Sequence, residues 1–284
     1  MPATILPDSS RSTIIRTIHF ISGLPRSGST LLSALLKQNP AFHASMSSPV
    51  HGMAASMMRD MSAANEYAVF IKPEQRLRVL RGIVENYYGP EYTAQVIIDT
   101  NRGWCAWMPQ LNALFPESRV IACVRNVSWI VDSIERLAQR NALSPSGIFN
   151  YQTGGTVYSR AEMLANGDGL VGFSYNALKE AFYGPHANKL LLVQYETMVT
   201  NPARVLEAVY RHLGQAPYPH DFNNVAYEAD EFDMRAGTPG LHSVRSKIEA
   251  IPRQTVLPPD VFNRFGNDAF WLHPQANLHG VQVI

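Results

Sequence analysis

The chain has 284 residues, of which 46% are hydrophobic and 17% are charged. A chain of this length and composition can bury one large core, and we expect a single domain over residues 1–284. The formal net charge of +1 excludes the broad basic surface that holds nucleic acid through its phosphates, so any anion site must be local.

Cysteine usage and the absence of long apolar runs bear on the compartment. Cys105 and Cys123 are the only cysteines, so no disulfide framework is available, and neither has the spacing of a metal ligand. The N-terminus lacks a basic head followed by a continuous apolar run, and no apolar run is long enough to span a membrane. We expect a cytoplasmic protein without an anchor.

The first part of the chain predicts a strand, a turn and a helix in succession. Residues 1–16 are polar and predict a loose arm. The run TIHFISG, ending at Gly23, predicts a strand, and TLLSALLKQ predicts a helix that stops at Asn39-Pro40. The Met-rich stretch 45–61 predicts either a helix lining a binding cleft or core filler.

Strands and helices then alternate along the chain. Apolar patterns predict strands at 95–99, 119–124 and 190–195, and helices at 74–86, 103–115, 129–141, 174–183 and 201–214. The polar stretch 144–155 predicts a loop over the site, and the tail from about residue 221 predicts an irregular wrap that closes it. This order indicates a three-layer α/β fold with a central parallel sheet, whose ligands bind at the carboxyl ends of the strands.

A phosphate-binding turn is predicted by the run GLPRSGST, from Gly23 to Thr30, where the first strand turns into a helix. Such a turn points backbone N–H groups and a helix dipole at one spot. The glycine spacing equals that of a Walker A loop, but Ser29 occupies the lysine position. We expect a 5′-phosphate cradle in which Arg26 balances the charge. The alternative is a glycine turn whose hydroxyls merely cap a helix.

The run GLPRSGSTLLSALL resembles the 5′-phosphosulfate-binding loop of the sulfotransferase superfamily, particularly its bacterial and protein-tyrosine branches. The resemblance implies a P-loop-like fold. It also implies 3′-phosphoadenosine 5′-phosphosulfate (PAPS) as donor and the bisphosphate PAP as product, with no metal. Donor contacts are expected from Pro25, Arg26, Ser27, Gly28, Ser29 and Thr30.

A second anion site is expected where the strand at 119–124 ends. Arg125 follows that strand, and Ser133 lies eight residues later, two turns into the next helix. By resemblance, this pair matches the family's 3′-phosphate motif. The resemblance further suggests that Tyr195 faces the nucleotide, although a buried structural tyrosine is an equal alternative. Ser243 and Arg245, with Lys247 a weaker candidate, lie in a late loop where exposure to solvent is the alternative.

Catalysis of sulfuryl transfer needs charge neutralisation, positioning and a base for the acceptor proton. Arg26 is the first candidate for charge stabilisation. Many relatives carry a lysine where this chain has Thr100. Arg102 could supply positive charge there, but a guanidinium is a poor proton donor. Asp99 is a base or an orienting partner.

The general base is the least determined part of the site. Tyrosine-sulfating relatives carry a glutamate after the first helix, whereas this chain has no carboxylate there before Asp60. His51 is the nearest candidate, because an imidazole suits proton abstraction at neutral pH. A hydrogen-bonded loop histidine is the alternative, and His43 and His242 are the next candidates.

We therefore expect a sulfotransferase that modifies the hydroxyl of a phenol, a tyrosine or another alcohol. The rivals are a P-loop kinase of a small molecule, against which the missing lysine argues, and an inactive nucleotide-binding protein of the same fold. The expected partner is a small-molecule or peptide acceptor, with no nucleic acid and no membrane. The oligomeric state is not readable from the sequence, and a homodimer is one option.

Overall fold

The computed structural model describes residues 16–152 and 155–284, so the predicted arm falls almost wholly outside the described part. Its centre is one parallel sheet with the strand order β2-β3-β1-β4-β5-β6. The strands are β1 (Thr17–Gly23), β2 (Phe42–Ala44), β3 (Val96–Thr100), β4 (Val120–Val124), β5 (Leu190–Gln194) and β6 (Gln282–Val283). The predicted α/β fold with a parallel sheet is confirmed.

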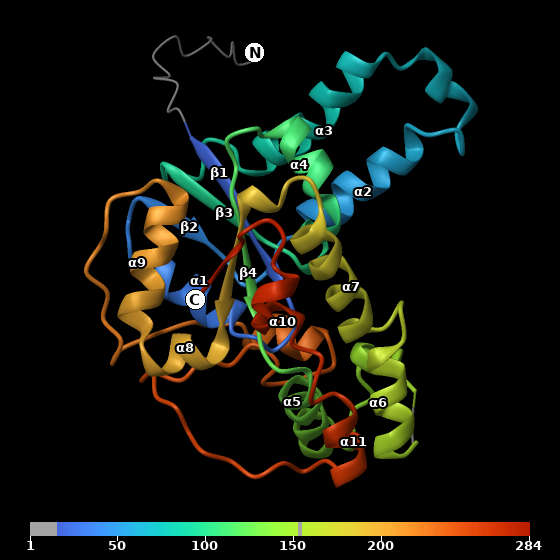
Figure 1. Cartoon of the computed structure of the whole chain (residues 1–284). Helices are drawn as coiled ribbons and strands as arrows, with labels where there is room; N and C mark the ends of the chain where they lie inside the picture. The colour runs from blue at the N-terminus through green and yellow to red at the C-terminus, as the bar shows by residue number, and fades with distance from the viewer. Residues whose placement is uncertain (1–15, 153–154) are drawn as a thin grey trace, which may run out of the picture.

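Alternate residues of each strand enter two separate cores. In β4, Val120, Ala122 and Val124 face one core, while Ile121 and Cys123 face the other, and all five are buried. This explains why the strand is apolar without interruption, because a parallel strand buries both faces. Helices cover both faces of the sheet (Figure 1).

The helices divide between the two faces by the core that they bury. One face carries α2 (Val50–Asp60), α3 (Pro73–Tyr87), α4 (Met108–Leu114), α5 (Val127–Arg140), α6 (Val157–Ala165), α7 (Leu170–Tyr183) and α11 (Pro259–Arg264). The other face carries α1 (Ser29–Leu36), α8 (Tyr195–Thr200) and α9 (Pro202–Leu213). The short helix α10 (Asp230–Arg235) belongs to the C-terminal wrap, and the ends of α2 and α3 extend away from the sheet (Figure 1).

Several predicted elements differ from the structure. The helix expected at 103–115 is a 3-10 segment, Arg102–Trp107, followed by α4, because Pro109 at the start of α4 has no N–H to continue a helix. The Met-rich stretch forms α2 and the residue after it: Met61 is buried in the core and Met58 packs against it, whereas Met53 and Met57 are exposed and are not core filler. Helix α6 and strands β2 and β6 were not expected. Among the helices of the described ranges, none combines the length and apolar character needed to cross a membrane.

Candidate functional site

The predicted phosphate turn joins β1 to α1 at the carboxyl edge of the sheet. Gly23 has φ +104°, and a Cβ there would lie 2.2 Å from the carbonyl oxygen of Cys123, so only glycine lets the turn lie against β4. Gly28 precedes α1 with φ +92° and provides no side-chain cap. The first N–H groups of α1 therefore remain able to bind an anion.

Arg26 links this turn to the second predicted anion site. Its backbone has φ +57°, which is uncommon for a residue other than glycine. Its Nε donates a hydrogen bond to Ser133 Oγ on α5 (3.1 Å). Arg125 Nη1 donates to the Arg26 carbonyl oxygen (3.4 Å). The structure thus brings the two predicted anion sites to the same place.

Arg125 makes weak contacts that leave one N–H donor of its guanidinium without a hydrogen-bond partner among the described residues. Its Cζ lies 4.1 Å from the ring centroid of Tyr195, and its Nε lies 3.7 Å from Glu196 Oε1, beyond hydrogen-bond range. That Nε is buried and finds no hydrogen-bond partner among the described residues. A buried unsatisfied donor is costly, so this atom fits a ligand acceptor such as a phosphate oxygen.

Arg253 adds a further positive charge that the sequence did not reveal. It lies 3.2 Å from Asp132 on α5 and 5.4 Å from the ring centroid of Trp129. Its charge lowers the pKa of Arg125, after burial, which is the larger cause. Arg253 belongs to a tail without periodicity, so no sequence signal placed it beside α5.

These arginines form a cationic cluster. Burial and then the charge of Arg125 lower the pKa of Arg26 to about 10. The guanidinium therefore remains charged at neutral pH, but it is destabilised by its neighbours. A ligand with several negative charges would relieve this repulsion.

Asp99 and Thr100, at the end of β3, are both buried. Asp99 is fully buried and accepts hydrogen bonds from Ser48 Oγ (2.5 Å), Tyr88 Oη (2.6 Å) and Trp104 Nε1 (2.6 Å). Burial raises the pKa of this carboxyl group. Its three partners fix the segment after β3 and leave no direct path to an acceptor, so the geometry favours the orienting alternative.

Arg102, by contrast, is exposed at the same edge. Its carbonyl oxygen accepts a hydrogen bond from Ser22 Oγ (2.9 Å), just before the phosphate turn. Its guanidinium makes no hydrogen bond or ion pair with any residue in the described ranges. Desolvation nevertheless lowers the pKa of Arg102, because neighbouring protein atoms displace part of the water around a side chain that still reaches solvent.

His51 lies within an aromatic cluster. Its ring centroid is 4.9 Å from that of Trp104 and 5.1 Å from that of Trp107, and a Cβ on Gly103 would lie 2.3 Å from the imidazole. Its Nε2 is buried and has no partner among the described residues. Burial lowers its pKa. This packing buries Nε2, while the residue as a whole is partly exposed. His43 lies among Tyr88 and Tyr92 instead.

His242 forms a dyad with Asp233. Its Nδ1 lies 2.5 Å from Asp233 Oδ1, and its backbone N–H donates to Asp233 Oδ2 (2.7 Å). Burial is the largest cause lowering its pKa, Asp233 opposes that change, and the charges of Arg26 and Arg102 lower the pKa further. The dyad therefore shares the region of both arginines. Sequence reasoning missed Asp233, since a nine-residue separation within an aperiodic tail carries no pairing signal.

The remaining late-loop candidates lie differently. Ser243, Arg245 and Lys247 are exposed, and the hydrogen bonds of the described residues do not join them to the phosphate turn. The loop before them is fixed to the segment after α5 by a hydrogen bond between the hydroxyls of Ser146 and Thr238 (2.5 Å). The structure thus places His242 near the arginines but leaves these three side chains in solvent.

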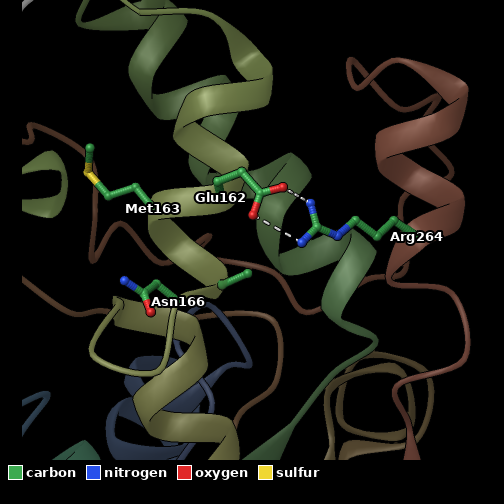
Figure 2. A pocket seen from close by; sticks show the side chains of 5 residues that line it. Glu162, Met163, Asn166 and Arg264 are labelled. Carbon is green, nitrogen blue, oxygen red and sulfur yellow. Dashed lines mark hydrogen bonds and ion pairs between the residues drawn. The ribbon is translucent and has the colours of Figure 1, made fainter.

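A separate pocket lies between α6 and α11. It is lined by Glu162, Met163, Ala165, Asn166 and Arg264. Arg264 forms an ion pair with Glu162, with Nη2 3.0 Å from Oε2 (Figure 2). None of the predicted site residues lines it, and its two charged residues already pair with each other.

The chain matches a known protein family and is similar to solved structures. The family model described as "Sulfotransferase family" matches residues 19–219. The sulfotransferase domain from the curacin biosynthetic pathway is 16% identical, with 88% of this chain and 96% of that chain covered and a TM-score of 0.51. The sulfotransferase domain of the Synechococcus PCC 7002 olefin synthase is 19% identical, with 87% and 93% covered and a TM-score of 0.45. A comparison with curated proteins finds no match.

Proposed function

On the premise that the chain belongs to the sulfotransferase family, a family of PAPS-dependent enzymes, we propose that it transfers a sulfuryl group from PAPS to a hydroxyl group of a small-molecule acceptor. The family match covers most of the chain, and the fold agrees with it.

The observation that carries the proposal is the hydrogen bond from Arg26 Nε to Ser133 Oγ (3.1 Å). It joins the turn expected to hold a 5′-phosphosulfate to the helix expected to hold a 3′-phosphate. One adenosine carrying anions at both positions can therefore reach both sites. The buried Arg125 Nε without a hydrogen-bond partner among the described residues supports the fit, because it offers a donor to the second anion.

In this proposal the turn from Pro25 to Thr30 binds the 5′ end through its backbone N–H groups and Arg26. Arg125 and Ser133 bind the 3′-phosphate, and Arg253 adds its charge to theirs. Tyr195, whose ring packs on Arg125, positions that guanidinium and borders the nucleotide. A kinase reading is less favoured, because Ser29 replaces the lysine that grips the outer phosphates of ATP.

We assign the general base to His242 in place of His51. With Nδ1–H donating to Asp233, the lone pair of His242 Nε2 is free to accept the hydroxyl proton. Burial, and after it the charges of Arg26 and Arg102, lower the pKa of His242 below its ordinary value, which favours the neutral imidazole at physiological pH. PAPS supplies the sulfuryl group. PAP leaves with the electron pair of the broken S–O bond, and the acceptor oxygen forms the new S–O bond. Asp99 and His51 then have positioning roles around Trp104.

A thermal-shift measurement tests the proposal. PAP should raise the melting temperature, since a ligand that binds only the native state at 100 times its Kd adds about 2.7 kcal/mol of stability. ATP with magnesium should have a smaller effect at the same concentration. A larger shift with ATP would contradict the assignment. Turnover of PAPS against panels of phenols, peptides and sugars then separates an enzyme from an inactive binder.

A further inference from the structure

Arg102 has a positive charge that no described residue neutralises. Its backbone is fixed, because its carbonyl oxygen accepts a hydrogen bond from Ser22 Oγ and the Asn101 side chain accepts one from the Gly103 N–H. Its side chain is exposed and makes no hydrogen bond or ion pair in residues 16–152 and 155–284. A guanidinium that extends from a fixed backbone position and has no carboxylate partner is suited to bind an oxyanion.

The carboxylates of Asp99 and Asp233 are already occupied by other donors. Asp99, three residues earlier, points inward and accepts three hydrogen bonds. Asp233 accepts from the backbone N–H and the imidazole of His242. Neither has a hydrogen-bond or ion-pair contact with Arg102, so protein groups in the described part do not satisfy the guanidinium.

The position of Arg102 differs from that of the donor-binding arginines. Arg26, Arg125 and Arg253 surround α5 and the phosphate turn. Arg102 follows β3, the strand on the other side of β1 from β4. The hydrogen bond from Ser22 Oγ to the Arg102 carbonyl oxygen nevertheless places the Arg102 backbone directly beside the start of the phosphate turn.

We propose that Arg102 binds an oxyanion of the acceptor, so that the enzyme acts on hydroxyl compounds that also carry a carboxylate or a phosphate. The inference rests on the proposed sulfotransferase function and names the acceptor class for the same site. Arg26 faces the group being transferred, His242 takes the hydroxyl proton, and Arg102 orients the acceptor through its anionic group.

Binding to the enzyme–PAP complex tests this without relying on turnover. Isothermal titration calorimetry compares 4-hydroxyphenylacetate and 4-hydroxyphenyl phosphate with the neutral 4-hydroxyphenylacetamide. We expect at least one anionic compound to bind about ten- to a hundredfold more tightly than the amide, because a charge-assisted hydrogen bond is worth that much. The acid and phosphate arms identify which oxyanion is preferred.

The variant Arg102→Gln should abolish that preference and leave PAP affinity unchanged. Arg204→Gln is the matched control, because Arg204 is an exposed arginine on α9. With PAPS as donor, Arg102→Gln should raise KM for the anionic acceptors more than it lowers kcat. An equal loss of kcat with acid and amide would assign Arg102 to the transferred group and overturn the proposal.

Equal affinities of the acid, phosphate and amide for the native complex, or no binding of either anionic compound at millimolar concentration, would also overturn it. Failure of the underlying function is distinguishable, because PAP would then fail to bind before any acceptor is added, or the protein would bind PAP but turn over PAPS with none of the acceptors, neutral or anionic.

Discussion

At the amino edge of the sheet, the buried ammonium of Lys189 donates to the carbonyl oxygens of Pro116 and Ser118, and the ring of His212 bonds to the Lys189 carbonyl oxygen (3.1 Å). At the carboxyl edge, Arg102 has no such partner among the described residues, and Arg125 keeps a buried Nε without one. Both edges hold positive charge. Protein groups satisfy the Lys189 ammonium, whereas they satisfy Arg125 only in part and Arg102 not at all among the described residues.

This difference separates structural charges from functional ones. A buried cation whose donors reach backbone carbonyls stabilises the connection between strands and has no capacity left for a ligand. Cations that cluster with too few acceptors raise the free energy of the unliganded protein, and an anionic ligand removes that cost. We therefore expect the binding sites for PAPS and for the hydroxyl compound where charged side chains lack hydrogen-bond partners within the protein.

The largest expected effect concerns the base at the carboxyl edge. His242→Ala should lower kcat by about 10²- to 10⁴-fold, the usual value of general base catalysis, while PAP affinity stays unchanged. Steady-state kinetics and calorimetry measure the two quantities, and His273→Ala, an exposed histidine, is the control. Full activity of His242→Ala, together with inactivity of His51→Ala, would return the base to His51.

The pH profile sharpens the same prediction. The neutral imidazole is the active form, so kcat/KM should fall as the pH drops through the pKa of His242, which lies below its ordinary value of 6.5. Asp233 raises that pKa, so Asp233→Asn should move the acid limb to lower pH. A limb that stays in place would show that the dyad does not act in turnover.

The donor site should show the next largest effect. Arg26→Ala and Arg125→Ala should each weaken PAP binding by about 3 kcal/mol, or roughly 150-fold, through loss of charge-assisted hydrogen bonds. Calorimetry on each variant and on the control Arg204→Ala measures this. Unchanged affinity in both site variants would mean that these arginines are structural, like Lys189 at the amino edge. The two edges would then not differ in function.

The smallest effect belongs to the amino edge and concerns stability. Burial lowers the pKa of His19, which is 4% exposed, from 6.5 to about 4. The unfolded chain therefore binds the proton more readily between these values, and stability falls as the pH falls. Urea unfolding should show a loss of about 2 kcal/mol from pH 7 to pH 5 that His19→Gln lacks. PAP affinity at pH 7 should not change in that variant.

Sequence reasoning succeeded where the information was local. The turn from Gly23 to Thr30 was predictable because glycine spacing, strand and helix follow one another directly, and Arg125 and Ser133 belong to one strand and helix unit. The convergence of these two sites through Arg26 depends on the order of strands β1 and β4, which the sequence implies only through the fold.

The tail limited the prediction. Asp233, His242 and Arg253 come from segments without periodicity, and their positions follow from tertiary contacts such as that of Ser146 with Thr238. Strand β6 is two residues long and completes the edge of the sheet beside β5, which no pattern of apolar residues could indicate. His51 was favoured because it lies close in sequence to the first helix, while its aromatic packing was invisible.

The left-handed backbone of Arg26 sets stability and function against each other at one position. A residue other than glycine with φ +57° holds strain of about 1 kcal/mol or more, and this side chain also experiences the repulsion of Arg125. Arg26→Gly would relieve both the strain and the repulsion. Selection for heat resistance alone would therefore favour a variant that binds PAPS more weakly. Improving such an enzyme therefore requires that ligand binding be selected alongside melting temperature.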